Sequence, residues 1–255
     1  MPFLTVDNIS VNFRGVKALA GVSFSVEEHS IFSVIGPNGS GKTTLFNLIN
    51  GIYKPDRGRI VFQGTDISRL SPDRIARRGI ARTFQNIELF SRASVMDNLL
   101  LGRHIHMRCG VFSGAFMWGR RSRAAREEIE NRESVEAVME FLGISPLRDH
   151  PVVNLPYGKR KLVELGRALA LEPRLLLLDE PTAGMSADEK KDLDVRIRAI
   201  RDQYKATIIL IEHDMGVVMG LSDTVLAIDQ GRVIAEGKPR EVQSHPDVVK
   251  AYLGS

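Results

Sequence analysis

The 255-residue sequence predicts an α/β fold: a mostly parallel β-sheet with crossover helices, interrupted by a helical insertion. Short apolar runs alternate with segments of helical spacing toward both ends of the chain. Between about 86 and 156 the strand signals disappear and only helical spacing remains. We expect one domain, 1–255, with an α/β core at 1–85 and 161–255 and a helical subdomain at 86–160.

In the first third of the chain, alternating apolar and polar residues predict strands at 3–9 and 22–26, and 30–35 is a more continuous apolar strand. A glycine-rich turn then leads into a helix at 43–50, with Gly51 at its C-cap. Ser71 and Pro72 form an N-cap and first position for a short helix that Gly79 ends. The next expected strand is 80–84.

In the insertion, one helix face is expected to carry Ile129, Val135, Val138, Met139 and Leu142, with Gly143 after it. Strands at 175–178, 207–211 and 224–228 follow the insertion. A capping box from Ser186 to Glu189 predicts a helix start.

The composition is that of an ordinary globular protein, with 43% hydrophobic and 26% charged residues. The net charge of +4 does not distinguish nucleic acid, anionic lipid and nucleotide as partners. A single cysteine, Cys109, excludes an internal disulfide framework and suits a reducing compartment. No run approaches the roughly 18–20 apolar residues that span a bilayer, and the first residues lack signal-peptide features, so we expect a protein kept inside the cell.

The segment 36–43, Gly-Pro-Asn-Gly-Ser-Gly-Lys-Thr, fits the phosphate-loop pattern G-x-x-x-x-G-K-[ST] between an apolar strand and a helix. Its glycines allow a concave nest of N–H groups, and the helix N-terminus adds about half a positive charge. A plain glycine-rich turn would need neither the lysine nor the hydroxyl. The expected ATP-binding residues here are Gly36, Asn38, Gly39, Ser40, Gly41, Lys42, Thr43 and Thr44, with Thr43 also a ligand of Mg²⁺.

Two carboxylates, Asp179 and Glu180, directly follow the apolar strand 175–178. Ligands of parallel α/β sheets bind at the carboxyl ends of the strands. We therefore expect Asp179 to hold Mg²⁺, directly or through water, and Glu180 to polarise a water molecule for attack on the γ-phosphate. The alternative is a strand end with two solvated acids.

Three further features single out one family. Leu155, Pro156, Tyr157, Gly158 and Lys159 begin a helix shortly before the acidic strand, and this segment resembles the signature motif of ABC ATPases, usually Leu-Ser-Gly-Gly-Gln. Gln85 is similar to the glutamine of the family's Q-loop, and His213 to its switch histidine. Phe13 stands where the family places an aromatic ring on adenine. The resemblance covers essentially the whole chain.

The resemblance implies a P-loop NTPase core of ABC ATPase type with an N-terminal antiparallel β subdomain, and ATP and Mg²⁺ as cofactors. Two such cassettes would close head to tail on two ATP molecules, with Leu155, Pro156, Tyr157 and Gly158 facing the γ-phosphate of the partner cassette. His213 would contact the γ-phosphate and the attacking water, and Gln85 would act in catalysis and at Mg²⁺. Packing beneath a hairpin is the alternative for Phe13.

The implied partners are integral membrane permease subunits, a second ABC ATPase subunit and, indirectly, a substrate-binding protein, without nucleic acid. The implied location is peripheral, on the cytoplasmic face of the inner membrane. Three positions depart from the family pattern: Pro156 replaces the signature serine, Tyr157 its first glycine, and Ser186 the usual aspartate of the D-loop. These departures change the groups available for contacts across the cassette dimer.

Several segments resemble the larger ATPase of branched-chain amino-acid importers. They are Arg-Thr-Phe-Gln-Asn at 82–86, Ala-Gly-Met at 183–185, Glu-His-Asp-Met at 212–215 and the tail 246–254. Importers of urea, amides and aromatic acids use close relatives, so the transported substrate stays open. Three further classes of protein also stay open: a lipopolysaccharide-type exporter ATPase, a subunit that binds ATP without turnover, and an ABC ATPase that acts on DNA or ribosomes.

The segment 99–126 contains no Asp or Glu but six arginines, namely Arg103, Arg108, Arg120, Arg121, Arg123 and Arg126. Such a segment could meet anionic lipid headgroups at about 1 kcal/mol per charge. We expect it to face the membrane partner, with Phe116 and Trp118 as anchors; a solvated basic face is the alternative.

Overall fold

The computed structural model describes residues 2–84, 87–106 and 123–253, which divide into two compact units. The first unit combines 1–82 with 174–255, and the second spans 83–173. The boundaries predicted from the sequence, 85/86 and 160/161, differ from this division. The second unit extends to Pro173 because helix α5 (Tyr157–Leu169), which the sequence assigned mostly to the core, packs against α3 (Val95–Gly102) at Gly166 and Leu99. Gln85, Cys109, Phe116, Trp118 and three arginines of the basic segment (Arg108, Arg120 and Arg121) lie outside the described residues.

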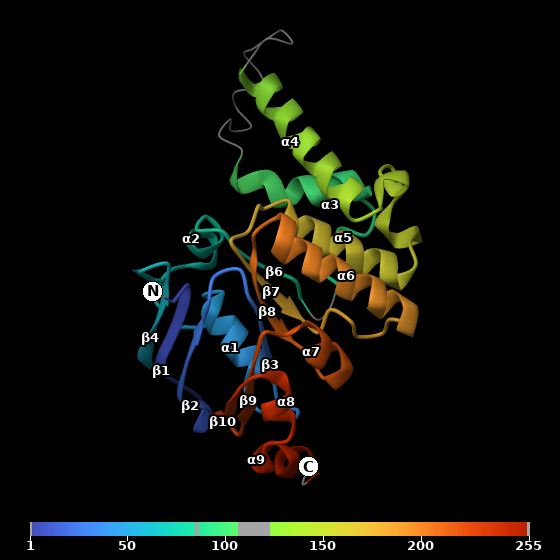
Figure 1. Ribbon diagram of the computed structural model, residues 1–255. Helices are drawn as coiled ribbons and strands as arrows, with labels where there is room; N and C mark the ends of the chain where they lie inside the picture. Colours follow the sequence, from blue (N-terminus) through green and yellow to red (C-terminus); the bar gives the residue numbers. More distant parts are fainter. Residues whose placement is uncertain (1, 85–86, 107–122, 254–255) are drawn as a thin grey trace. The chain divides into compact units, whose positions relative to one another are not determined.

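The first unit contains a six-stranded sheet in the order β10-β9-β3-β8-β7-β6 (Figure 1). The strands are β3 (Ile31–Ile35), β6 (Ile80–Arg82), β7 (Leu175–Asp179), β8 (Thr207–Ile211), β9 (Thr224–Asp229) and β10 (Arg232–Gly237). All pairs are parallel except β9 with β10. The predicted mostly parallel sheet is therefore confirmed, and β3 lies inside it with all five residues buried, as its nearly continuous apolar run predicts.

A second, antiparallel sheet has the order β2-β1-β4-β5. It consists of β1 (Leu4–Phe13), β2 (Val16–Val26), β4 (Arg57–Phe62) and β5 (Thr65–Asp66). The β1–β2 hairpin turns at Arg14 and Gly15, both with positive φ, as a two-residue type I′ turn requires. Both strands of this hairpin are longer than the alternation predicted, because register shifts in the pairing interrupt the regular pattern.

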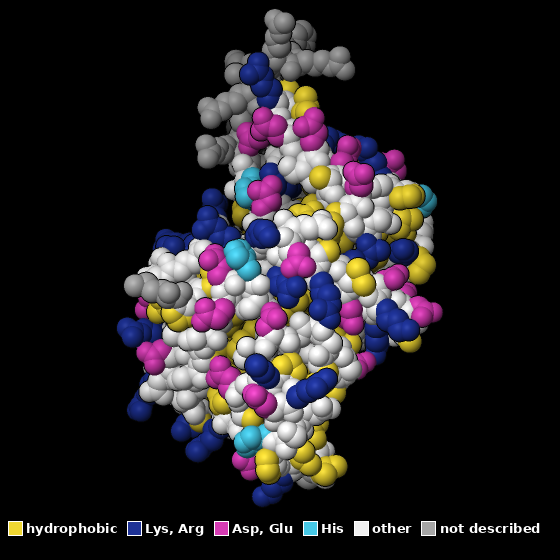
Figure 2. Space-filling view, in the orientation of Figure 1, with side chains coloured by type: hydrophobic (Ala, Val, Ile, Leu, Met, Phe, Trp, Pro, Cys, Tyr) yellow, Lys and Arg dark blue, Asp and Glu magenta, His cyan; other side chains and the backbone are white. Residues whose placement is uncertain are grey.

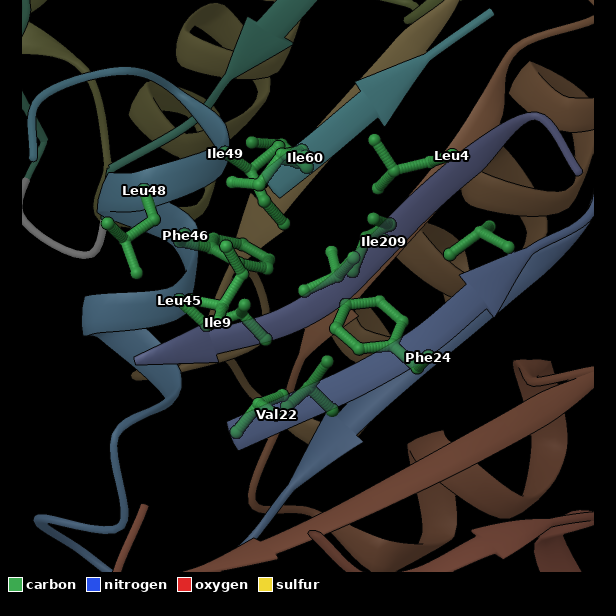
Figure 3. Packing of buried hydrophobic residues seen from close by; sticks show 14 of the residues in the cluster. Leu4, Ile9, Val22, Phe24, Leu45, Phe46, Leu48, Ile49, Ile60 and Ile209 are labelled. Carbon is green, nitrogen blue, oxygen red and sulfur yellow. The ribbon is translucent and has the colours of Figure 1, made fainter. Parts of the chain in front are cut away.

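The main core fills the space between the two sheets and α1 (Lys42–Ile49). Figure 3 shows side chains from α1, β1, β2, β4 and β8 converging there. Phe24 of β2 stacks on Phe32 of β3 with ring centroids 5.2 Å apart. Since alternate side chains of a strand point to opposite faces, Phe32 and Val34 join this cluster, whereas Ile35 faces the other side of the sheet.

Helices that follow the strands cover that other face. They are α7 (Met215–Leu221), α8 (Pro239–Gln243) and α9 (Pro246–Leu253), whose Val218, Val242 and Val248 pack with Ile35, Val225 and Ala227. Helix α6 (Ala187–Gln203) begins with the predicted capping box, in which Ser186 and Glu189 exchange hydrogen bonds. The short α2 (Pro72–Ala76) begins at the predicted Ser71 and Pro72. On the face drawn in Figure 2, basic and acidic side chains are interspersed.

The second unit contains α3, α4 (Arg123–Phe141), α5 and three short 3₁₀ turns, η1 (Arg103–Ile105), η2 (Ser145–Leu147) and η3 (Val152–Asn154). The predicted apolar face is right for Val135, Val138 and Met139 on α4 and for Leu142 directly after it, all of which are buried. It is wrong for Ile129, which is 51% exposed. The six residues from Ile129 to Val135 advance about 240° around the helix axis, so Ile129 points away from the buried face.

Within the described ranges 2–84, 87–106 and 123–253, we find no helix with the length and apolar character needed to cross a membrane.

Candidate functional site

The phosphate loop joins β3 to α1, and its three glycines are required for two different reasons. A Cβ at Gly36 would lie 2.0 Å from the carbonyl oxygen of Ile228, and one at Gly41 would lie 2.7 Å from that of Ala18. These two glycines therefore let the loop pack against the backbone of β9 and β2. Gly39 has a φ of 78°, and a Cβ there would meet nothing within 4 Å. The loop thus presents an open, left-handed backbone turn at Gly39, which leaves room for a ligand.

Lys42, the first residue of α1, is buried and directed back into the loop. Its Nζ donates hydrogen bonds to the carbonyl oxygens of Gly36 at 2.8 Å and Pro37 at 2.9 Å. Burial lowers the pKa of Lys42, while the charges of Glu180 and Asp179 act in the opposite direction. The lysine that the sequence assigned to phosphates therefore lies in the field of the predicted acid pair.

Asp179 ends β7 and forms a buried ion pair with Arg82, the last residue of β6. Nη2 of Arg82 lies 2.8 Å from Oδ2 of Asp179, and Nη1 donates to Oδ1 of Asn47 on α1 at 2.5 Å. The guanidinium also lies 5.6 Å from the ring centroid of Phe46. Arg82 thus ties the acidic strand end to the helix that follows the phosphate loop. Sequence reasoning missed this role, although an arginine inside the predicted strand 80–84 was an available signal.

Glu180 and His213 follow the adjacent strands β7 and β8 and meet at the carboxyl edge of the sheet. Nε2 of His213 lies 2.9 Å from Oε1 of Glu180. The Glu180 backbone has a φ of 49° and its N–H donates to Ile211 at 2.9 Å, so a sharp turn directs the side chain toward His213. The edge of the sheet therefore holds a carboxylate and an imidazole in direct contact, an arrangement suited to acid–base chemistry.

Glu212, beside His213, holds the segment that follows Glu180. Its buried carboxylate accepts hydrogen bonds from the Thr182 N–H at 2.9 Å and the Thr182 hydroxyl at 2.6 Å. In the sequence Glu212 is part of the Glu-His-Asp-Met segment, which by itself predicts no role for this carboxylate. Its buried position after the end of β8 indicates that it fixes the turn between Glu180 and α6.

Phe13, at the end of β1, is 39% exposed and makes an edge-to-face contact with Tyr53, their ring centroids 4.9 Å apart. A role at adenine and packing beneath the hairpin both stay predictions for Phe13. Tyr53 was not among the predicted site residues; it follows α1 in a loop, and aromatic content alone gave no reason to pair it with Phe13.

The remaining predicted residues lie as follows. In the loop and α1, Asn38 and Thr43 are exposed, Ser40 is buried and Thr44 is half-buried. In the second unit, Pro156 is the N-cap of α5, Leu155 and Gly158 are buried, and Tyr157 is 45% exposed. Gln85 falls outside the described residues.

The oxygen atoms of Thr43 and Asp179 suit a Mg²⁺ ion that a phosphate ligand would also bind. No group of three or more His, Cys, Asp or Glu side chains gathers around a possible ion position in the described part of the chain. The oxygens of Thr43 and Asp179 are hard ligands, and Mg²⁺ in phosphate sites usually takes only one or two protein oxygens and keeps several waters.

Comparisons with known proteins agree on one family. The model of the ABC transporter family matches residues 19–183, and a model described as branched-chain amino acid ATP-binding cassette transporter matches 232–255. The chain is 39% identical over 253 residues to the high-affinity branched-chain amino acid transport ATP-binding protein LivG of Salmonella typhimurium, covering 99% of this chain and 98% of that one. It has the same identity and coverage to the corresponding protein BraF of Pseudomonas aeruginosa.

Among solved structures, the fold is similar to an ATP-binding cassette of an ABC transporter in its ADP conformation, with a TM-score of 0.86, 34% identity and full coverage of both chains. The predicted family and fold are therefore confirmed. One sheet of this chain carries a phosphate loop, a buried aspartate at a strand end and a glutamate–histidine pair. Together with these matches, they show that the chain belongs to the family of ABC transporter ATP-binding subunits, whose cassettes bind and hydrolyse ATP.

Proposed function

We propose that this chain is the ATPase subunit of an importer of branched-chain amino acids, and that it acts on the cytoplasmic face of the cell membrane through separate permease subunits. The observation that carries the ATPase part is the contact between Glu180 and His213 at the sheet edge, in the same electrostatic neighbourhood as Lys42. The substrate class is supported by the names of the relatives and by the family match over 232–255.

The phosphate loop binds the triphosphate. Its N–H groups and the N-terminus of α1 face the anionic oxygens, and Lys42 exchanges its bonds to the loop carbonyls for bonds to the β- and γ-phosphates. Phe13, with Tyr53 against its edge, offers a ring for the adenine. Thr43 and Asp179, with Gln85, would hold Mg²⁺. When bound, this ion neutralises charge on the phosphate oxygens.

Glu180 is the general base. It accepts a proton from a water molecule as the water oxygen forms a bond to the γ-phosphorus; the bond to the β,γ-bridging oxygen breaks, and ADP leaves with that electron pair. His213, in contact with Glu180, orients the carboxylate and the water. The products are ADP and inorganic phosphate.

The partners follow from the same proposal. A second ABC ATPase subunit, identical or related, closes on the nucleotide with the segment Leu155–Gly158, where α5 presents its N-terminus. Pro156 has no hydroxyl for this contact, so the N–H groups of the first turn and Gly158 make it. Permease subunits bind the cassettes, and a substrate-binding protein delivers the amino acid to the permeases; no nucleic acid takes part.

The test is reconstitution of the chain with its permease, partner ATPase and binding-protein subunits in liposomes. We expect ATP hydrolysis that leucine, isoleucine or valine stimulates in the presence of the binding protein, that chelation of Mg²⁺ abolishes, and that a Lys42→Ala variant lacks. Stimulation by urea, amides or aromatic acids instead would contradict the substrate class. Hydrolysis that persists in Lys42→Ala would contradict the site.

A further inference from the structure

The C-terminal helix α9 contacts the phosphate loop through the side chain of Tyr252. The Tyr252 hydroxyl accepts a hydrogen bond from the N–H of Gly36 at 2.9 Å, which joins the first residue of the loop to a helix 216 positions later in the chain. We propose that Tyr252 is a positioning residue of the nucleotide site, which holds the start of the phosphate loop in the conformation that receives the triphosphate. This inference rests on the proposed function of the loop.

Helix α9 is anchored well enough to hold the tyrosine in place. Val248, one turn before Tyr252, is 3% exposed and packs in the cluster that contains Ile35. Ile35 is the last residue of β3 and directly precedes Gly36. The helix therefore packs against the end of the strand from which the loop departs. Burial raises the pKa of the Tyr252 hydroxyl, so this group stays neutral near physiological pH.

The hydrogen bond between Tyr252 and Gly36 affects the phosphate-binding Lys42, because Gly36 contacts both residues. Its N–H is bound by Tyr252, and its carbonyl oxygen accepts the hydrogen bond from Nζ of Lys42 at 2.8 Å. The close approach to Ile228 leaves no space for a side chain at this residue. A continuous path of hydrogen bonds thus runs from α9 through the backbone of Gly36 to Lys42.

The other end of the loop is held by the β9–β10 turn. The N–H of Gly231 donates to the carbonyl of Ser40 at 2.9 Å, and the N–H of Ala20 donates to the carbonyl of Gly231 at 2.8 Å. A cavity of about 660 Å³ borders the loop. It is lined by loop residues 37–40, by Asp229, Gln230, Arg232 and Ile234 of the β9–β10 region, and by Asp247, Lys250 and Ala251 of α9. The loop therefore borders this hollow, while hydrogen bonds with Tyr252 and Gly231 hold its two ends.

The test removes the hydroxyl and keeps the ring, in Tyr252→Phe of the full chain. We expect a fluorescent ATP analogue to bind about three- to tenfold more weakly, as loss of one hydrogen bond to a buried donor predicts. In the reconstituted complex, the KM for ATP should rise with kcat little changed, because loop positioning affects binding more than the chemical step. The Gly36 amide should exchange its hydrogen faster, measured by NMR.

Leu253→Ala is the matched control, since Leu253 lies on the same helix and is 83% exposed; affinity and Gly36 exchange should stay at the wild-type values. Val248→Ala, which loosens α9 and leaves the hydroxyl in place, should weaken binding in the same direction as Tyr252→Phe. Wild-type affinity and wild-type Gly36 exchange in Tyr252→Phe would overturn the inference, as would a lowered melting temperature with unchanged affinity. Nucleotide binding unchanged in Lys42→Ala would instead overturn the proposed function of the loop.

Discussion

Arg82 and Asp179 form an ion pair that is almost fully removed from solvent, with side-chain exposures of 4% and 2%. The two residues end the neighbouring strands β6 and β7, and they belong to the two separate stretches of chain that make up the first unit. The ion pair therefore both joins the ends of β6 and β7 and holds in place the Asp179 carboxylate that we assign to Mg²⁺.

Arg82→Met should lower the free energy of unfolding by about 3–5 kcal/mol, because it removes the cation that faces the buried Asp179 carboxylate. The control is Arg59→Met, which removes an exposed pair with Asp7, whose side chains are 64% and 49% exposed; its cost should stay below about 1 kcal/mol. Chemical denaturation measures both. If both variants lost a similarly small free energy of unfolding, the buried pair would not be important for stability.

Glu180→Gln should slow ATP hydrolysis by about 10²- to 10⁴-fold while nucleotide binding persists, because the amide cannot accept the proton of the water. His213→Ala should also lower kcat, since it removes the group that contacts Oε1 of Glu180. Glu28→Gln, at an exposed position of the same unit, serves as the control and should hydrolyse ATP at the wild-type rate. Equal turnover of Glu180→Gln and wild type would rule out Glu180 as the base.

Glu164 on α5 predicts a pH dependence of stability. Its buried carboxylate accepts the N–H of Phe84 at 3.1 Å, and burial raises its pKa above the ordinary value of 4.5, against the opposing effects of that hydrogen bond and of Lys161. The folded state thus binds the proton more tightly than the unfolded state. The associated stabilisation is complete below pH 4.5 and is lost as pH rises through the raised pKa.

Glu164→Gln keeps an oxygen acceptor for Phe84 but has no proton to lose. The difference in melting temperature between this variant and wild type should therefore shift in favour of the variant as pH rises from 4.5. Thermal scans of both proteins across this range measure the effect. A difference that stays constant with pH would show that Glu164 titrates alike in the folded and unfolded states.

Gly102 marks a close approach of α3 to α5. A Cβ there would lie 2.2 Å from the carbonyl oxygen of Arg167 and 3.2 Å from Cβ of Ala170, so Gly102→Ala should destabilise the chain by about 1–3 kcal/mol. Gly220 on α7 offers a matched change, because a Cβ at that position meets nothing within 4 Å. Gly220→Ala should be neutral or stabilising by up to about 1 kcal/mol. If denaturation showed that Gly102→Ala and Gly220→Ala both destabilise the chain, or that both stabilise it, the close approach at Gly102 would not explain the effect.

The parts of the fold that sequence could predict are those governed by local pattern. Strands β3, β7, β8 and β9 are buried, largely apolar runs, and α1 and α6 follow a glycine-rich loop and a capping box. Strands β4 and β10 were not predicted, because exposed residues and Gly58 break their alternation. Their pairing with β1 and β9 determines that they are strands.

In the candidate site too, local sequence pattern predicts some of the residues and not others. Lys42, Asp179, Glu180 and His213 stand in motifs whose spacing follows from their chemistry, so they could be named in advance. The contacts of Arg82 with Asp179 and of Tyr252 with Gly36 join residues that are distant in sequence. No local pattern encodes such a contact, since it depends on strand order and on where the last helix packs.

The central place of β3 has a consequence for how the protein is made. Its neighbours in the sheet are β8 and β9, so Ile31 pairs with Ile208 and Phe32 with Thr224. During translation this largely apolar strand emerges early and has no partner on either edge until most of the chain has followed. A nascent or truncated chain that ends before β8 exposes an unpaired apolar strand and is prone to aggregate.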